Sequence, residues 1–130
     1  MFVSLKPISS GDNDLARNHS PKKILENMKL FIDTVKKLHS NISILILSIK
    51  PSPARIHLLE KSNKTNKLIA QYAKKTENVH FLDLSSKMLM KNNKPDPTLF
   101  GSDRLHMNKK GYDLWTNILT PILKKLLKKE

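Results

Sequence analysis

The apolar residues of this chain recur with a helical period in two separate segments. Over residues 21–39 they follow one another at spacings of three and four, which predicts an amphipathic helix. Ser20 and Pro21 form a typical opening for that helix, with Ser as the N-cap and Pro at the first helical position. The same spacing returns from Lys109 onward and predicts a last helix, which we expect Pro121 to kink or to divide into two pieces.

Two segments between these helices have the composition of buried strands. Ile42–Ile49 is a nearly unbroken run of β-branched residues and leucine, and Val79–Leu84 is a second apolar run. Pro51 and Pro53 predict an extended loop after the first strand. Between the two strands, residues 56–75 carry a weaker helical pattern, so helices and strands alternate along the chain.

This alternation predicts an α/β fold. The order helix, strand, helix, strand, helix, with right-handed crossovers, gives a parallel sheet with helices on both faces, which is a three-layer α/β/α arrangement. In such a sheet, sites form beyond the carboxyl ends of the strands. Residues 11–14, residues 50–55 and the loop after Leu84 would all lie there, provided that a strand precedes the first of them.

The first ten residues do not have the pattern of such a strand. The apolar residues among them are Phe2, Val3, Leu5 and Ile8. Pro7 interrupts this set, and proline is rare inside a strand. We therefore expect residues 1–10 to be an atypical N-terminal segment.

Length and composition limit the kind of protein further. At 130 residues the chain has the size of a single domain, residues 1–130. It has no cysteine, which excludes a disulfide framework and a thiolate metal site. No segment approaches the roughly 20 apolar residues of a membrane-spanning helix, and the opening residues are too few for the apolar core of a signal peptide. We therefore expect a cytoplasmic protein with no membrane span.

The net charge of +13 at first favours a nucleic acid or an anionic membrane as the partner. Of the 24 basic residues, however, only Arg17, Arg55 and Arg104 are arginine. Recognition of phosphates and bases usually uses arginine forks and stacking aromatic residues. We therefore interpret the charge as a solvated, lysine-rich surface and expect no nucleic-acid partner, with a basic nucleic-acid binder as the weaker alternative.

The polar segment 102–108 carries the best candidate for chemistry. Asp103 stands three residues before His106, so both side chains can face the same side of the backbone. The carboxylate can then accept the Nδ1 proton and leave Nε2 free as a base. Such a base works beside a nucleophilic hydroxyl and a donor for the oxyanion, and Asn13 is the candidate donor. The other four histidines have no carboxylate at ligand-like spacing, so we expect no metal and no cofactor.

Two blocks of this sequence resemble the SGNH (GDSL-type) esterase/lipase hydrolases. Residues 11–14, Gly-Asp-Asn-Asp, match the Gly-x-Asn-Asp block of that family. Residues 103–106, Asp-Arg-Leu-His, together with Asn108, match its Asp-x-x-His block. The separation of 93 residues between Asn13 and His106 suits the third and fifth blocks of the family. The resemblance extends over residues 11–123.

The resemblance implies a role for each matching residue. His106 would be the general base, Asp103 the carboxylate that orients it, and Asn13 the donor of a side-chain amide to the oxyanion. The implied fold is the flavodoxin-like three-layer α/β/α fold of these hydrolases, and the implied reaction is hydrolysis of a small acyl ester.

Two catalytic blocks of the family have no counterpart in this chain. The Gly-Asp-Ser block with the nucleophilic serine, and the glycine whose N–H completes the oxyanion hole, both precede the Asn block, where this chain has ten residues. The chain therefore resembles the C-terminal part of an SGNH hydrolase, N-terminally truncated by a strand, a helix and a second strand. We expect it to be inactive without a serine-bearing segment and to self-associate through the exposed sheet edge. A non-catalytic remnant or binding module is the alternative.

Overall fold

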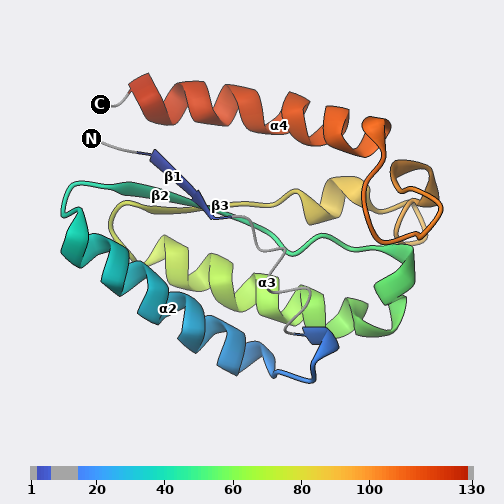
Figure 1. Ribbon diagram of the computed structural model, residues 1–130, viewed down its shortest axis with the longest axis horizontal. Coiled ribbons are helices and arrows are strands. Elements are labelled where there is room, and N and C mark those ends of the chain that lie inside the picture. The colour runs from blue at the N-terminus through green and yellow to red at the C-terminus, as the bar shows by residue number, and fades with distance from the viewer. Residues whose placement is uncertain (1–2, 7–14, 129–130) are drawn as a thin grey trace.

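The structure, a computed structural model, describes residues 3–6 and 15–128. A parallel sheet lies in the middle, helices α2 and α3 cover one of its faces, and helix α4 covers the other (Figure 1). The described strands, in their order across the sheet, are β1 (Val3–Lys6), β2 (Ser43–Leu47) and β3 (Val79–Leu82). The long helices are α2 (Pro21–Leu38), α3 (Leu59–Lys74) and α4 (Lys109–Lys128), and the short 3-10 helices are η1 (Pro53–Leu58), η2 (Ser85–Met88) and η3 (Pro97–Leu99). The predicted α/β fold, with a parallel sheet between helices, is confirmed.

Helix α2 begins where the sequence predicts it. The Ser20 hydroxyl accepts a hydrogen bond from the backbone N–H of Lys23 at 3.1 Å, which satisfies one of the free donors of the first turn. Pro21 occupies the first helical position, where no N–H is needed. The buried side chains that follow are Ile24, Met28 and Ile32.

Strand β2 belongs to both apolar layers. All five of its residues are buried. Ile44 and Ile46 pack in the layer with α2 and α3, whereas Leu45 and Leu47 pack in the layer beneath α4. Successive side chains of a strand point to opposite faces, so a strand covered on both faces must be apolar at nearly every position. The prediction of a strand buried on both faces is confirmed for this segment.

The opening segment differs from its prediction. Residues 3–6 form a strand that pairs in parallel with β2, with Leu5 opposite Leu45. The expectation that residues 1–10 lack a strand is therefore wrong. The strand is four residues long and ends before Pro7, so the missing N–H of that proline does not fall within the paired residues.

Strand β3 and two prolines also depart from expectation. In β3 only Val79 is buried and the other three residues are half-buried, because β3 lies at an edge of the described sheet. Pro53 starts the helix η1 instead of continuing an extended loop, since its fixed φ suits a first helical position. Pro121 lies inside α4, which runs as one helix through it, so the predicted division into two pieces is wrong, whereas the predicted kink stays a prediction.

Two buried polar side chains fix the chain beyond the carboxyl ends of β2 and β3. The Ser48 hydroxyl accepts hydrogen bonds from the backbone N–H groups of Leu84 and Ser85, both at 2.9 Å. The Asn66 side chain reaches from α3 to Ile49, accepting from its N–H at 2.8 Å and donating to its carbonyl at 3.3 Å. Buried backbone groups need such partners, so these contacts set the path of the loops at that end of the sheet.

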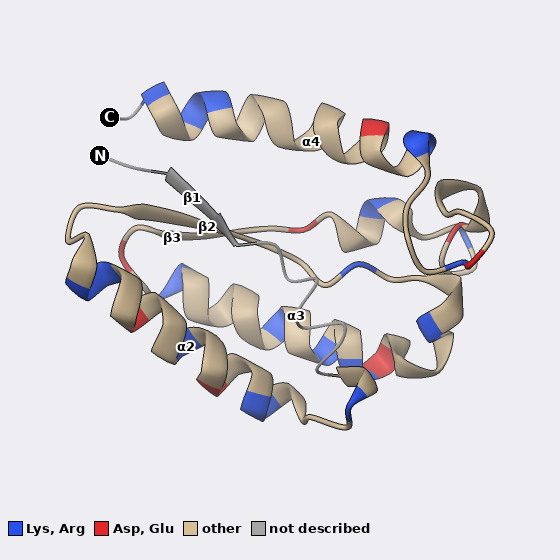
Figure 2. Ribbon diagram, viewed as in Figure 1, with Lys and Arg blue, Asp and Glu red and all other residues tan. Residues whose placement is uncertain are grey.

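Basic residues are spread over the surface of the molecule. Figure 2 shows lysine and arginine on α2, on α3 and toward both ends of α4. This distribution is what a solvated, lysine-rich surface would give. None of the helices in the described part of the chain has the length and apolar character needed to cross a bilayer.

We predict that Asn66→Ala lowers the free energy of unfolding by about 2 kcal/mol or more, because the buried N–H and C=O of Ile49 lose their partner. Urea unfolding followed by circular dichroism measures the change. Asn63→Ala is the matched control, since Asn63 lies exposed on the same helix and should change the value by no more than about 0.5 kcal/mol. Equal losses in the two variants would contradict a stabilising role for the Asn66 bridge.

Candidate functional site

The candidate residues lie in a short loop, residues 101–107, between η3 and α4. The N–H of Gly101 donates to the carbonyl of His106 at 2.9 Å, and the N–H of Arg104 donates to the carbonyl of Gly101 at 3.0 Å. Arg104 has a φ of 58°, the left-handed conformation that lets the chain reverse within a few residues. The loop is therefore closed by its own backbone.

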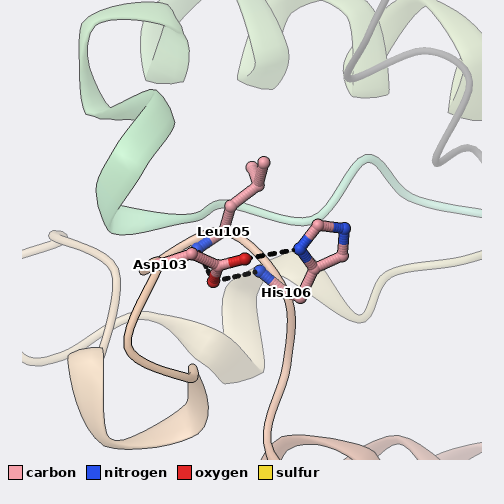
Figure 3. Close-up of polar contacts among 3 residues, drawn as sticks. All are labelled: Asp103, Leu105 and His106. Atoms are coloured by element: carbon pink, nitrogen blue, oxygen red, sulfur yellow. Dashed lines mark hydrogen bonds and ion pairs between the residues drawn. The ribbon is translucent and has the colours of Figure 1, made fainter.

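Asp103 and His106 contact each other directly in this loop. Oδ2 of the carboxylate and Nδ1 of the ring are 2.6 Å apart, and Figure 3 shows the second ring nitrogen facing away from the carboxylate. The other carboxylate oxygen, Oδ1, accepts the backbone N–H groups of Leu105 and His106 at 2.9 and 3.0 Å. Asp103 therefore holds the ring through Nδ1 and leaves Nε2 to another partner.

These hydrogen bonds also set the charge of the carboxylate. The bond from the His106 ring is the largest cause, followed by the two backbone N–H groups, and together they lower the pKa of Asp103 well below its ordinary value of 3.8. Asp103 is therefore ionised throughout the neutral range. The side chain of His106 is 75% exposed and that of Asp103 51%, so a further segment can reach the pair without any unfolding.

The loop rests against the segment that follows β2. The N–H of Ala54, in η1, donates to the carbonyl of Arg104 at 3.0 Å. Residues 50–55 were expected beyond the carboxyl ends of the strands. This contact places them beside the loop that carries His106.

Asn13 lies outside the described residues, as do all of residues 11–14, so its place beside His106 stays a prediction. In the described part of the chain, no hydroxyl is hydrogen-bonded to Nε2 of His106. Residues 3–6 and 15–128 also contain no group of three or more His, Asp or Glu side chains that could hold a metal ion. A hollow of about 410 Å³ lies beside the start of α4, and neither Asp103 nor His106 lines it.

Asn108 holds the loop in place, a role that the sequence alone did not reveal. Its amide donates to the carbonyls of Thr98 and Phe100 at 2.9 and 3.1 Å, and its side-chain oxygen accepts the N–H of Gly111 at 3.0 Å. One side chain thus joins the segment before the loop to the first turn of α4. An Asn just before a predicted helix is the N-cap signal that could have identified it.

A comparison of the whole sequence with models of protein families identifies the family of this chain. The model of the GDSL-like Lipase/Acylhydrolase family matches residues 5–114, which is most of the chain and includes Asp103 and His106. The chain belongs to the GDSL-like lipase/acylhydrolase family. The family match begins within β1 and ends within α4, so it takes in all of β2 and β3 and the second half of β1.

A solved structure shows the same fold at low sequence similarity. A protein from Streptococcus pneumonia, described as "a putative platelet activating factor", matches this GDSL-like chain with a TM-score of 0.76 at 20% identity. The match covers 86% of this chain but 56% of that protein, so the chain spans little more than half of the larger fold. No curated protein matches this member of the family.

We predict that Gly111→Ala destabilises the start of α4 in this GDSL-like chain. A Cβ at that position would lie 2.4 Å from the carbonyl oxygen of Leu99 and 2.9 Å from Cβ of Met107. The expected loss is about 1–3 kcal/mol of unfolding free energy, measured by thermal unfolding. Gly101→Ala is the control, because its nearest neighbour would be the His106 carbonyl at 3.7 Å, an ordinary contact. A stable Gly111→Ala protein would mean that α4 does not start this close to η3.

We predict that His106→Ala raises the pKa of Asp103 toward 3.8, because the ring supplies the largest of the bonds that lower it. In the parent chain, ionised Asp103 stabilises the loop at every pH above its ordinary pKa, and that contribution is lost as the pH falls through the lowered value. An NMR titration of the Asp103 carboxyl carbon measures the pKa of Asp103 in the parent chain and in the variant. His39→Ala, which removes an exposed histidine at the end of α2, should leave the titration unchanged. An Asp103 pKa that is the same with and without His106 would contradict the pairing.

Proposed function

We propose that this chain supplies the base of an ester hydrolase acting on a small acyl ester. The observation that carries the proposal is the 2.6 Å contact between Oδ2 of Asp103 and Nδ1 of His106 in a chain of the GDSL-like acylhydrolase family. In this arrangement Asp103 orients the ring and balances the positive charge that the ring acquires. Nε2 of His106 is then the atom that takes and returns the proton.

The nucleophile in this proposal is a serine on a segment outside this chain. Its Oγ–H donates to Nε2 of His106, which takes the proton as Oγ attacks the ester carbonyl carbon. The side-chain amide of Asn13 donates to the oxyanion that forms. The oxyanion then collapses, the bond to the alkoxy oxygen breaks, and the alcohol leaves with the proton from Nε2. Water attacks the acyl-serine in the same way, which releases the carboxylic acid and restores the serine.

The exposure of the pair supports a site shared between two segments. With 75% of its side chain accessible, His106 has room for a partner on the Nε2 side. A covering segment would also exclude water, which strengthens the electrostatic interactions of a developing transition state. The loop that carries the base contacts the segment that follows the carboxyl end of β2. Ligands of α/β folds bind beyond the carboxyl ends of the strands.

One observation favours the second candidate, a non-catalytic remnant or binding module. Oδ1 of Asp103 accepts the N–H groups of Leu105 and His106, so the carboxylate would stabilise this turn even if no reaction took place. The two candidates differ in whether the chain gains activity when a serine is supplied.

We predict that the chain alone hydrolyses p-nitrophenyl acetate no faster than background, and that a family member's Gly-Asp-Ser segment joined ahead of Met1 confers activity. In the joined protein, His106→Ala should reduce kcat on the order of 10⁴-fold, because the serine loses its base. Asn13→Ala should reduce kcat by about 10²–10³, the usual cost of one oxyanion donor. Initial rates of p-nitrophenolate release measure these effects.

The control variant for this experiment is His39→Ala, which removes an exposed imidazole remote in sequence from the loop and should leave kcat unchanged. Activity of the chain alone that disappears with His106→Ala would mean that one of its own serines is the nucleophile. A joined protein that folds but stays inactive would favour the non-catalytic candidate. An active joined protein that tolerates Asn13→Ala would contradict the assigned oxyanion donor.

A further inference from the structure

We infer that the outer edge of β3 is a docking site for an extended, acidic peptide segment of another protein, which adds to the sheet as a further strand. The described sheet ends at β3, whose inner side pairs with β2. Helix α3 packs on one face of this strand and helix α4 on the other (Figure 1). The inference is independent of the proposed ester hydrolysis and uses no residue of the loop that carries His106.

The backbone of β3 presents hydrogen-bonding groups at this edge. The carbonyl of Asn78 accepts the N–H of Ile44 at 2.8 Å, on the β2 side. The carbonyl of Leu82 accepts the N–H of Ser48 at 3.1 Å, on the same side. In a parallel pair, residues that bond to one neighbour alternate with residues whose N–H and C=O point the other way. The N–H and C=O of Phe81 therefore point away from β2, toward an edge where no described strand lies.

On the α3 face, small side chains leave room beside this edge. A hollow of about 300 Å³ is lined by Ala70, Ala73 and Lys74 of α3 and by β3. A second hollow, of about 280 Å³, shares Ala70 and Phe81 with the first and continues past Lys67. Because an alanine side chain ends at Cβ, this flank of α3 leaves a trough that incoming side chains can fill.

The α4 face carries a smaller hollow beside the same strand. Its volume is about 210 Å³, and it lies between residues 80–82 and the side chains of Ile122, Lys125 and Leu126. Successive side chains of an added strand point to opposite faces, so alternate residues would enter this hollow and the trough on the α3 face. Peptide recognition by strand addition has this form, in which backbone hydrogen bonds give affinity and pockets for alternate side chains give specificity.

Lysine side chains at the rims of these hollows determine the charge of the occupant. Lys67 and Lys74 line the α3 face and Lys125 lines the α4 face, whereas Asp83 is the single acidic residue among the described residues that line the three hollows. The three lysines are exposed, and none forms an ion pair within the described part of the chain. They repel a second copy of this chain, whose net charge is +13, and attract an acidic segment. The occupant is therefore acidic, with apolar side chains between its charges.

The test uses the full chain and a synthetic probe, the fluorescein-labelled peptide Glu-Asp-Val-Val-Val-Asp-Glu with blocked ends. We expect saturable binding by fluorescence anisotropy. Binding should weaken about tenfold or more when the three valines are N-methylated, because the probe then loses its backbone donors. The N–H of Phe81 should also exchange with solvent more slowly when the probe is bound, as hydrogen exchange followed by NMR would measure.

Three charge reversals provide matched variants. Lys74→Glu and Lys125→Glu act on the two faces of the β3 edge, whereas Lys23→Glu makes the same change of net charge in the first turn of α2. All three lysines are exposed, so each variant should change the Tm by no more than about 2 °C. Each of the first two should weaken probe binding on the order of fivefold, and Lys23→Glu by no more than about twofold.

Absence of saturable binding up to about 1 mM probe, or equal weakening by all three variants, would overturn the inference. So would equal binding of the N-methylated probe, because the probe would then be held by its charge alone. A chain that is already a dimer, in which the N–H of Phe81 exchanges slowly before any probe is added, would also overturn it, since the occupant would be a second copy. None of these measurements involves ester hydrolysis, so their failure would leave the proposed function untouched.

Discussion

The burial of β2 on both faces is the constraint on which the rest of this structure depends. Its isoleucines need the layer of α2 and α3, and its leucines need α4, so a helix layer is required on each side. The carboxyl end of the strand is then fixed by Ser48, which holds the turn after β3, and by Asn66, which holds Ile49. From there the chain reaches η1, and Ala54 contacts the loop that carries His106. The position of the candidate base thus traces back to the central strand.

The parts of the fold that the sequence predicts are those decided by neighbouring residues. The start of α2 could be predicted because Ser20 and Pro21 act within one turn of the helix. Strand β2 could be predicted because burial on two faces leaves an unbroken apolar run. Residues 3–6 gave no such signal, since their pairing is decided by the exposed backbone of β2 more than by their own composition.

In the candidate site too, contacts between neighbouring residues could be predicted, whereas contacts between distant segments could not. The contact of Asp103 with His106 could be predicted from a spacing of three residues, because the two belong to one turn of the chain. The N-cap position of Asn108 gives a local signal as well, through its bond to Gly111. The bonds of Asn108 to Thr98 and Phe100, and the contact of Ala54 with the loop, could not be predicted, because their partners are brought near only by the fold. Asn13 keeps its predicted role in the proposed mechanism, on the strength of the block that it matches. Membership of the GDSL-like family and the parallel sheet between helices are established.

The hydrogen bonds of Asp103 have a consequence for how far the Asp103–His106 pair depends on the rest of the fold. All of them end within residues 103–106, and the surrounding loop is closed by its own backbone. The Asp103–His106 pair is therefore assembled by a few consecutive residues of one loop. Substitutions elsewhere in the sheet can therefore change what surrounds the ring while the pairing of Asp103 with His106 stays intact.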